Sequence, residues 1–128
     1  MSTPLNLQQD SSVAALALMH PVKPGRADQL REALQHLSHE DIAVMRGERP
    51  IGAVQWIIFD NNTRLLCTIQ FEGTVEALLQ DFATYGAERC RGIWGNCIGY
   101  PDGDARTIDA IVAYLAAGQV PTTASFLA

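Results

Sequence analysis

The chain has 128 residues, of which 48% are hydrophobic and 18% are charged. This length suits one hydrophobic core, and the composition is too apolar for a disordered chain. Fourteen acidic residues against nine basic ones give a net charge of −5. A negative surface repels phosphate backbones, which argues against nucleic acid as a partner.

The N-terminus carries no targeting signal that we can identify. Residues 1–12 have neither a basic n-region nor an apolar h-region, so we expect a flexible tail followed by a single domain over residues 13–128. The longest apolar run, Val13–Met19, is too short to cross a bilayer, which takes about 20 residues. We therefore expect a cytoplasmic protein that does not bind membranes.

Three cysteines are spread over the second half of the chain, without the paired spacing of a zinc site. They are Cys67, Cys90 and Cys97. Because the cytoplasm keeps thiols reduced, we expect them to be buried free thiols.

The first half of the chain begins with a strand and a helix. Residues 13–20 form an apolar run that stops at a proline, which is typical of a strand covered on both faces. Residues 23–38 carry apolar side chains at helical spacing after a Pro-Gly start, and they predict a helix. Residues 39–50 mix charged residues with glycine and proline, which indicates a long loop or a frayed helical extension.

A β-hairpin is predicted in the middle of the chain. Residues 51–60 and 64–73 are rich in β-branched and aromatic residues, and Asn61 and Asn62 suit a tight turn. Alternation places apolar side chains on both faces of this hairpin. Helices can cover one face, so the second face predicts a second subunit.

The remaining elements are mostly helical. Residues 74–86 predict a helix capped by a threonine, and residues 86–103 predict a short helical turn followed by irregular chain. Residues 104–118 predict a third helix that ends at Gly118. Residues 120–128 contain a β-prone run that predicts a last strand, with a frayed tail as the alternative.

The predicted order is βαββαβ with an extra helix before the last strand, which is the ferredoxin-like pattern. The stretches PVKPGRADQLREAL (21–34), RLLCTIQFEGTVEALLQDF (64–82) and IWGNCIGYP (93–101) resemble bacterial members of the dimeric α/β-barrel superfamily, especially uncharacterised ferredoxin-like proteins. Glu72 stands where these relatives carry Asp. The resemblance implies an α+β fold with a four-stranded antiparallel sheet. Helices cover one face, and a second copy packs on the open face to form the dimeric α/β barrel.

The superfamily includes cofactor-independent monooxygenases, lactone isomerases and haem enzymes, so the fold does not select a function. We expect a homodimer that binds a small apolar molecule between sheet and helices, without a cofactor. The alternative is a cofactor-independent monooxygenase or isomerase of an aromatic or lactone substrate. A third hypothesis is a structural or interaction module.

His20 is the candidate catalytic residue. It ends the first predicted strand, and an imidazole titrates near neutrality, so it could serve as a general base. A single histidine at a strand end also occurs as a structural residue. As a haem ligand it lacks a paired distal arginine.

The candidate ligand-binding residues lie on the hairpin and in the stretch IWGNCIGYP, which could be a pocket rim or only a strap between helices. They are Trp56, Gln70, Trp94, Asn96 and Tyr100. Aromatic side chains form pocket walls, and amide or hydroxyl groups orient a ligand. Gln55 and Gln70 could instead face solvent.

No metal site is predicted. His36 and His39 are three residues apart near Glu40 and Asp41, a spacing that can place two imidazoles on one helical face. A third ligand has no clear candidate, and such a cluster at the end of a surface helix is usually solvated.

Overall fold

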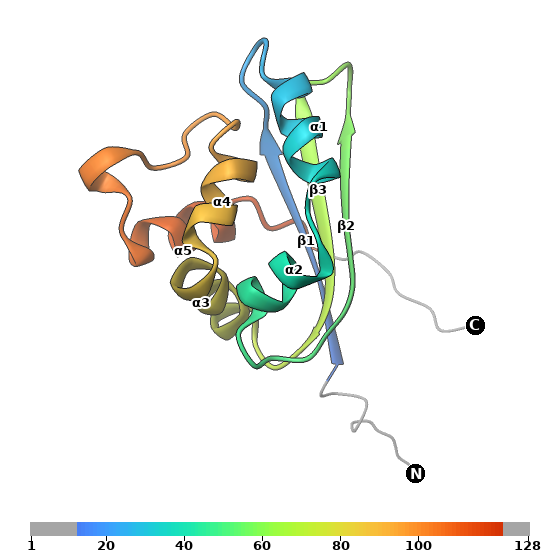
Figure 1. Cartoon of the computed structure of the whole chain (residues 1–128), viewed down its shortest axis with the longest axis vertical. Coiled ribbons are helices and arrows are strands. Elements are labelled where there is room, and N and C mark those ends of the chain that lie inside the picture. The colour runs from blue at the N-terminus through green and yellow to red at the C-terminus, as the bar shows by residue number, and fades with distance from the viewer. Residues whose placement is uncertain (1–12, 122–128) are drawn as a thin grey trace.

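The computed structural model describes residues 13–121, so the predicted tail and most of the predicted last strand lie outside the described residues. Figure 1 shows a mixed α+β arrangement in which helices lie on one side of an antiparallel sheet. In chain order the elements are β1 (Val13–Pro21), α1 (Ala27–Gln35), α2 (His39–Arg46), β2 (Ile51–Phe59), β3 (Arg64–Glu72), α3 (Val75–Tyr85), α4 (Ala87–Trp94), a 3-10 turn at Gly103–Ala105 and α5 (Ile108–Ala117).

The sheet of the described residues has the strand order β1-β3-β2, and both pairs are antiparallel. The hairpin between β2 and β3 is confirmed. Its turn places Asp60, Asn61 and Asn62 at positive φ (56°, 57° and 68°). Asn and Asp tolerate this conformation better than other side chains that carry a Cβ, which explains the turn composition.

Strand alternation gives the sheet two distinct faces. The face toward the helices carries Leu16, Leu18, His20, Val54, Trp56, Ile58, Leu65, Cys67, Ile69 and Phe71. We call the other surface the open face. Its centre carries Ala15, Ala17, Met19, Ala53, Gln55, Ile57, Phe59, Leu66, Thr68 and Gln70, and Arg64 and Glu72 lie on it at the two ends of β3.

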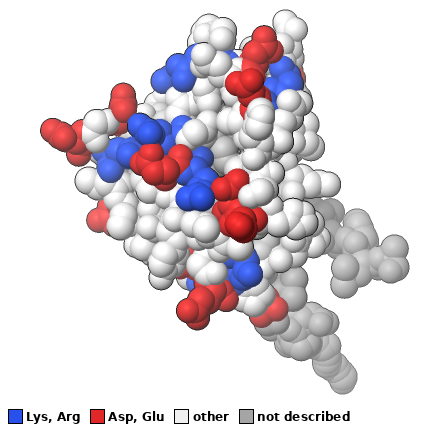
Figure 2. All heavy atoms as spheres, in the orientation of Figure 1, with Lys and Arg blue, Asp and Glu red and all other residues white. Residues whose placement is uncertain are grey.

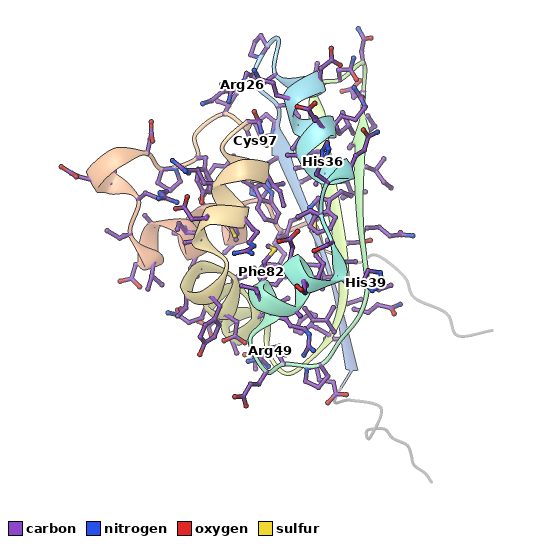
Figure 3. All side chains as sticks on the ribbon, viewed as in Figure 1. Arg26, His36, His39, Arg49, Phe82 and Cys97 are labelled. Carbon is purple, nitrogen blue, oxygen red and sulfur yellow. The ribbon has the colours of Figure 1, made fainter. Side chains whose placement is uncertain are left out.

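The helices bury their apolar stripes against one another and against the sheet. Leu78 and Phe82 of α3, Trp94 of α4 and Ile111 and Leu115 of α5 are at most 2% exposed. Figure 3 shows Phe82 within the layer of side chains that the helices enclose. Burial of these side chains is the main source of stability for this layer.

The segment predicted as a loop or frayed extension contains a separate helix. Residue Ser38 caps α2: its hydroxyl accepts from Asp41 N at 3.1 Å, and its own N–H donates to the Asp41 carboxylate at 2.9 Å. This reciprocal capping box satisfies amides that a helix start leaves unpaired. The helix therefore forms without a clean apolar period.

The chain after α5 returns to the sheet beside β1. Met19 N donates to Gly118 O at 2.7 Å, and Val120 N donates to Ala17 O at 2.8 Å. Leu18 and Gln119 form an antiparallel bridge. Gly118–Val120 thus pair with the edge of β1 that β3 leaves free.

Candidate functional site

The stretch IWGNCIGYP pairs with the chain that follows β1. Lys23 N donates to Asn96 O at 2.9 Å, and Ile98 N donates to Pro21 O at 2.9 Å. Val22 and Cys97 form the antiparallel bridge between these two bonds. We call residues 95–98 the strap. It fixes the end of β1 to the helix layer, and one pocket lies on each side of it.

His20 is buried at this end of β1, with an exposure of 3%. Its Nε2 lies 3.0 Å from the carbonyl oxygen of Tyr114 on α5. A carbonyl oxygen only accepts, so Nε2 carries the proton and Nδ1 keeps a lone pair. Nδ1 is buried and has no hydrogen-bond partner among the described residues.

Aromatic rings surround the imidazole. Tyr114 stacks on it with centroids 4.6 Å apart at 22°, and Trp94 meets it edge-on at 6.3 Å and 75°. Tyr100 meets Tyr114 at 5.4 Å and 89°. The Tyr114 hydroxyl donates to Ile98 O in the strap at 2.8 Å. This aromatic cluster joins β1, α4, α5 and the strap.

The electrostatic environment keeps the groups of the cluster uncharged. Burial lowers the pKa of His20, and the hydrogen bond to Tyr114 only partly opposes this, so the imidazole is neutral at pH 7. Burial raises the pKa of Cys97 to about 12, which holds it as a thiol. A thiol is a poor nucleophile, so this environment does not activate Cys97.

A pocket of about 510 Å³ lies beside His20, and we call it the His20 pocket. Its apolar lining comes from Met19, Pro21, Val22, Pro24 and Ile98, and its polar lining from His20, Thr63 and Arg64. This volume falls within the range of small-molecule sites, which is about 300–1,000 Å³. A mostly apolar wall with a few polar groups is also typical of such sites.

Two of the predicted ligand-binding residues serve the interior of the protein. Trp94 is fully buried. The Asn96 amide donates to Gly92 O at 2.9 Å and to Ile93 O at 3.3 Å, while its oxygen accepts from Arg26 Nε at 3.0 Å. Asn96 therefore satisfies carbonyls at the end of α4 and ties that helix to the start of α1.

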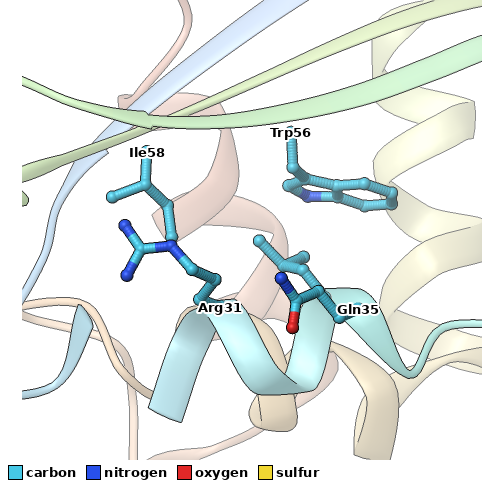
Figure 4. Close-up of a pocket in the computed structure, with 5 residues that line it drawn as sticks. Arg31, Gln35, Trp56 and Ile58 are labelled. Carbon is cyan, nitrogen blue, oxygen red and sulfur yellow. The ribbon is translucent and has the colours of Figure 1, made fainter. Parts of the chain in front are cut away.

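The other predicted residues lie apart from one another. Trp56 faces α1 and lines a hollow of about 330 Å³ with Arg31 and Gln35 (Figure 4). Gln70 is exposed on the open face, beside a hollow of about 360 Å³. Tyr100 does not line the His20 pocket but a different one, with Lys23 and Arg26. The structure brings His20, Trp94 and Tyr100 into one cluster but keeps Trp56 and Gln70 outside it.

Tyr114 is the residue of the cluster that sequence reasoning missed. The stripe used to predict the last helix was Ile108, Ile111, Val112 and Leu115. Tyr114 lies three residues after Ile111 and so faces nearly the same side. That spacing was the available signal.

The two histidines considered for a metal lie apart. Figure 3 places His36 at the end of α1 and His39 at the start of α2. His36 Nδ1 lies 2.8 Å from Glu32 O, within its own helix. No group of three histidine, cysteine or acidic side chains in residues 13–121 is placed to hold a metal ion.

None of the described helices is long and apolar enough to cross a membrane. Comparisons of the chain with protein-family models, with curated proteins and with solved structures found no match.

Proposed function

We propose that this chain is a ferredoxin-like protein of the cytoplasm that forms a homodimer and binds a small, largely apolar molecule in the His20 pocket. The observation that carries the proposal is the His20 pocket itself, with its apolar wall and its volume of about 510 Å³. Three buried free thiols fit a reducing compartment.

The strand arrangement supports a ferredoxin-like sheet. β1 has β3 on one edge and Gly118–Val120 on the other, and both neighbours run antiparallel to it. A fourth strand that begins at Gly118 gives the four-stranded antiparallel sheet expected of this fold. The helices on one face of the sheet agree with the same architecture (Figure 1).

The open face supports a second copy of the chain as its cover. Its ten central residues are uncharged, although charged residues make up 18% of the chain, and its two charged residues, Arg64 and Glu72, lie at the ends of β3. Ile57 is 47% exposed and Phe59 is 38% exposed, and a shallow hollow lined by alanines lies on the same face. In a two-fold dimer the projecting side chains of one copy can fill the hollow of the other.

Glutamate substitutions at three isoleucines of similar exposure can test dimerisation and ligand binding separately. Ile57 (47%) lies on the open face, Ile98 (50%) lines the His20 pocket, and Ile108 (41%) lies on α5 outside both. We expect Ile57→Glu to convert a dimer into a monomer in sedimentation analysis. We expect Ile98→Glu and Ile108→Glu to leave the dimer intact.

Binding can be measured with 1-naphthol, an aromatic probe, by its effect on the methyl resonances of the pocket. Saturable shifts of Met19, Val22 and Ile98 are expected in the native chain, with weaker binding in Ile98→Glu and unchanged binding in Ile108→Glu. The absence of saturable shifts in the native protein would contradict the proposed ligand site. A monomer at all protein concentrations would contradict the proposed dimeric barrel.

A second candidate function is cofactor-independent oxygenation or isomerisation with His20 as the base. The observation in its favour is the unpartnered lone pair on Nδ1 of a neutral imidazole. In this chemistry the substrate supplies the carbanion, and the protein supplies desolvation and the base. Oxygen uptake with phenolic substrates would be abolished in His20→Gln, while unchanged uptake would exclude His20 from the reaction.

A further inference from the structure

A second pocket lies on the other side of the strap, between the start of α1 and α4. Its volume is about 460 Å³, and we call it the basic pocket. The charged and hydroxyl side chains that line it are Lys23, Arg26, Arg91, Glu88, Asp102 and Tyr100. Unlike the His20 pocket, it is mainly polar. It plays no part in the proposed function.

Basic residues gather at the basic pocket, where acidic side chains lie among them, and Figure 2 shows the same mixture of basic and acidic side chains on this face of the molecule. Lys23 is the only lysine of the chain, and with Arg26 and Arg91 it gives three cations against two carboxylates in the wall. Arg106 adds a fourth cation through its contact with Glu88 at 3.1 Å. Four of the nine basic residues thus gather at one pocket of a chain whose net charge is −5.

One of the two carboxylates, Glu88, is held in ion pairs with two arginines. Glu88 accepts from Arg91 Nη2 at 2.7 Å and from Arg106 Nη2 at 3.1 Å. The hydrogen bond from Arg106 and the charge of Arg91 hold the pKa of Glu88 below its usual value, so it remains an anion. Asp102 accepts from the Gly103 amide at 2.8 Å.

The two cations on the other wall keep free donors. Arg26 uses Nε to bond Asn96, which orients its guanidinium and leaves both Nη groups without a partner in the described part of the chain. Figure 3 shows Arg26 at the start of α1, close to the strap that carries Cys97. Lys23 takes part in no ion pair among residues 13–121. These donors are available to a ligand.

Tyr100 adds a neutral donor to the same wall. Its hydroxyl is buried without a hydrogen bond of good geometry, although Arg106 lies close enough to act on it. Burial raises the pKa of Tyr100 to about 12, so the phenol keeps its proton at neutral pH. A buried hydroxyl without a partner is uncommon in native proteins, so the phenol of Tyr100 is a candidate donor for a ligand.

We propose that the basic pocket binds a small molecule through a phosphate monoester group. The lining holds one cation in excess of its carboxylates, and Arg106, paired with Glu88, adds a second. Together they match a phosphate monoester, which carries a charge of about −1.5 to −2 at pH 7. Its oxygens share one centre and can accept from donors on different elements, as the guanidinium fork and the ammonium group provide here. A carboxylate has only two oxygens in one plane.

The test is a titration of the full chain with phenyl phosphate at low salt, in which NMR spectra monitor the backbone amide resonances. Saturable shifts are expected at Lys23, Gly92, Gly95 and Tyr100, with weaker binding as salt rises. Lys23→Ala and Arg91→Gln should each weaken binding about tenfold, since a charge-assisted hydrogen bond contributes more than a neutral one. The two variants are independent, so one that failed to fold would leave the other informative.

Arg31→Gln is the matched control. Arg31 lies on α1 in an i,i+3 ion pair with Asp28 and is 41% exposed, while Arg91 lies on α4 in an i,i+3 ion pair with Glu88 and is 58% exposed. The control should bind phenyl phosphate as the native chain does. Three results would overturn the proposal: no saturable shifts, binding that survives both pocket variants, or malonate bound as tightly as phenyl phosphate.

Discussion

Gly118 lies against the imidazole of His20, so closely that a Cβ added at Gly118 would overlap Nε2 and Cε1 of the ring. Nε2 is also the atom that bonds the Tyr114 carbonyl. Gly118 has φ near −90°, a conformation open to any residue, so its role is to leave space rather than to permit a special backbone. A glycine late in the chain thus makes room for a buried histidine near its start.

Gly118→Ala is therefore expected to displace the imidazole and to break its hydrogen bond to Tyr114 O. We expect a loss of about 1–3 kcal/mol in the free energy of unfolding, because a buried polar group loses its partner. Urea denaturation would measure it. The control is Gly92→Ala, since a Cβ at Gly92 meets nothing within 4 Å. That helical substitution should stabilise by roughly 0.5–1 kcal/mol.

The stability of the native chain should fall as pH drops below about 6.5. Burial lowers the pKa of His20 in the folded state, so between that lowered value and the ordinary pKa of 6.5 the unfolded chain binds more protons. Stability then rises with pH in this window, with a slope of up to about 1.4 kcal/mol per pH unit. Above pH 6.5 the contribution of the neutral His20 to the free energy of unfolding is fully present.

His20→Gln isolates this effect, because the glutamine amide can still donate to Tyr114 O but does not titrate. Urea midpoints at pH 7.5 and 5.5 should differ more in the native chain than in His20→Gln. His36 and His39 are exposed and remain in both proteins. Equal pH dependence of the two proteins would show that the imidazole is not buried neutral.

The three cysteines should be unreactive in the folded protein. Cys67 and Cys90 are fully buried, and burial raises the pKa of Cys90 to about 12 and that of Cys67 further. Because the thiolate is the reactive form, Ellman's reagent at pH 8 should label no thiol before unfolding and three after it. Rapid labelling of Cys97 in the folded state would contradict the burial of this strap residue.

Arg49 is expected to stabilise the connection between α2 and β2. It pairs with Asp81 of α3 at 3.0 Å, and its Nη1 donates to Glu72 O at 2.9 Å. Both side chains of the pair are about one-fifth exposed. Arg49→Met should cost about 1–2 kcal/mol in unfolding free energy, because it leaves the mostly buried carboxylate of Asp81 and the carbonyl of Glu72 without their donor.

The matched control for Arg49 is Arg64, whose ion pair with Asp60 is about half exposed on both sides. Exposed ion pairs contribute little, so Arg64→Met should change the unfolding free energy by less than about 1 kcal/mol. Thermal unfolding of both variants would give the comparison. If the Arg64 variant lost as much stability as the Arg49 variant, burial would not explain the role of Arg49.

Local sequence patterns predicted the hairpin of β2 and β3, while the fourth strand expected of the sheet is not among the strands of the described residues. The alternation of residues 51–60 and 64–73 assigned the two faces, because each side chain on a strand points to the side opposite its neighbour. Asn61 and Asn62 marked the turn. Residues 39–50 were expected to be a loop or a frayed helical extension rather than the separate helix α2, although Ser38 and Asp41 have the spacing of a capping box.

The candidate site could be predicted only in part, because its contacts join distant residues. His20 and Tyr114 are 94 positions apart, and Arg26 and Asn96 are 70 apart. Periodic patterns within a short stretch of sequence do not reveal contacts between residues so far apart. The sequence marked His20 and the stretch IWGNCIGYP as unusual, but the burial of the imidazole and the use of the Asn96 amide inside the protein depend on tertiary packing.

Both neighbours of β1 come from later in the chain, since β3 begins at Arg64 and the segment on the other edge begins at Gly118. During synthesis β1 is made before either of these neighbours, so both of its edges are at first unpaired. An unpaired apolar strand is a template for pairing with other chains. A chain released before Gly118 would keep one edge of β1 open, so truncated products of this protein should aggregate while the full chain folds.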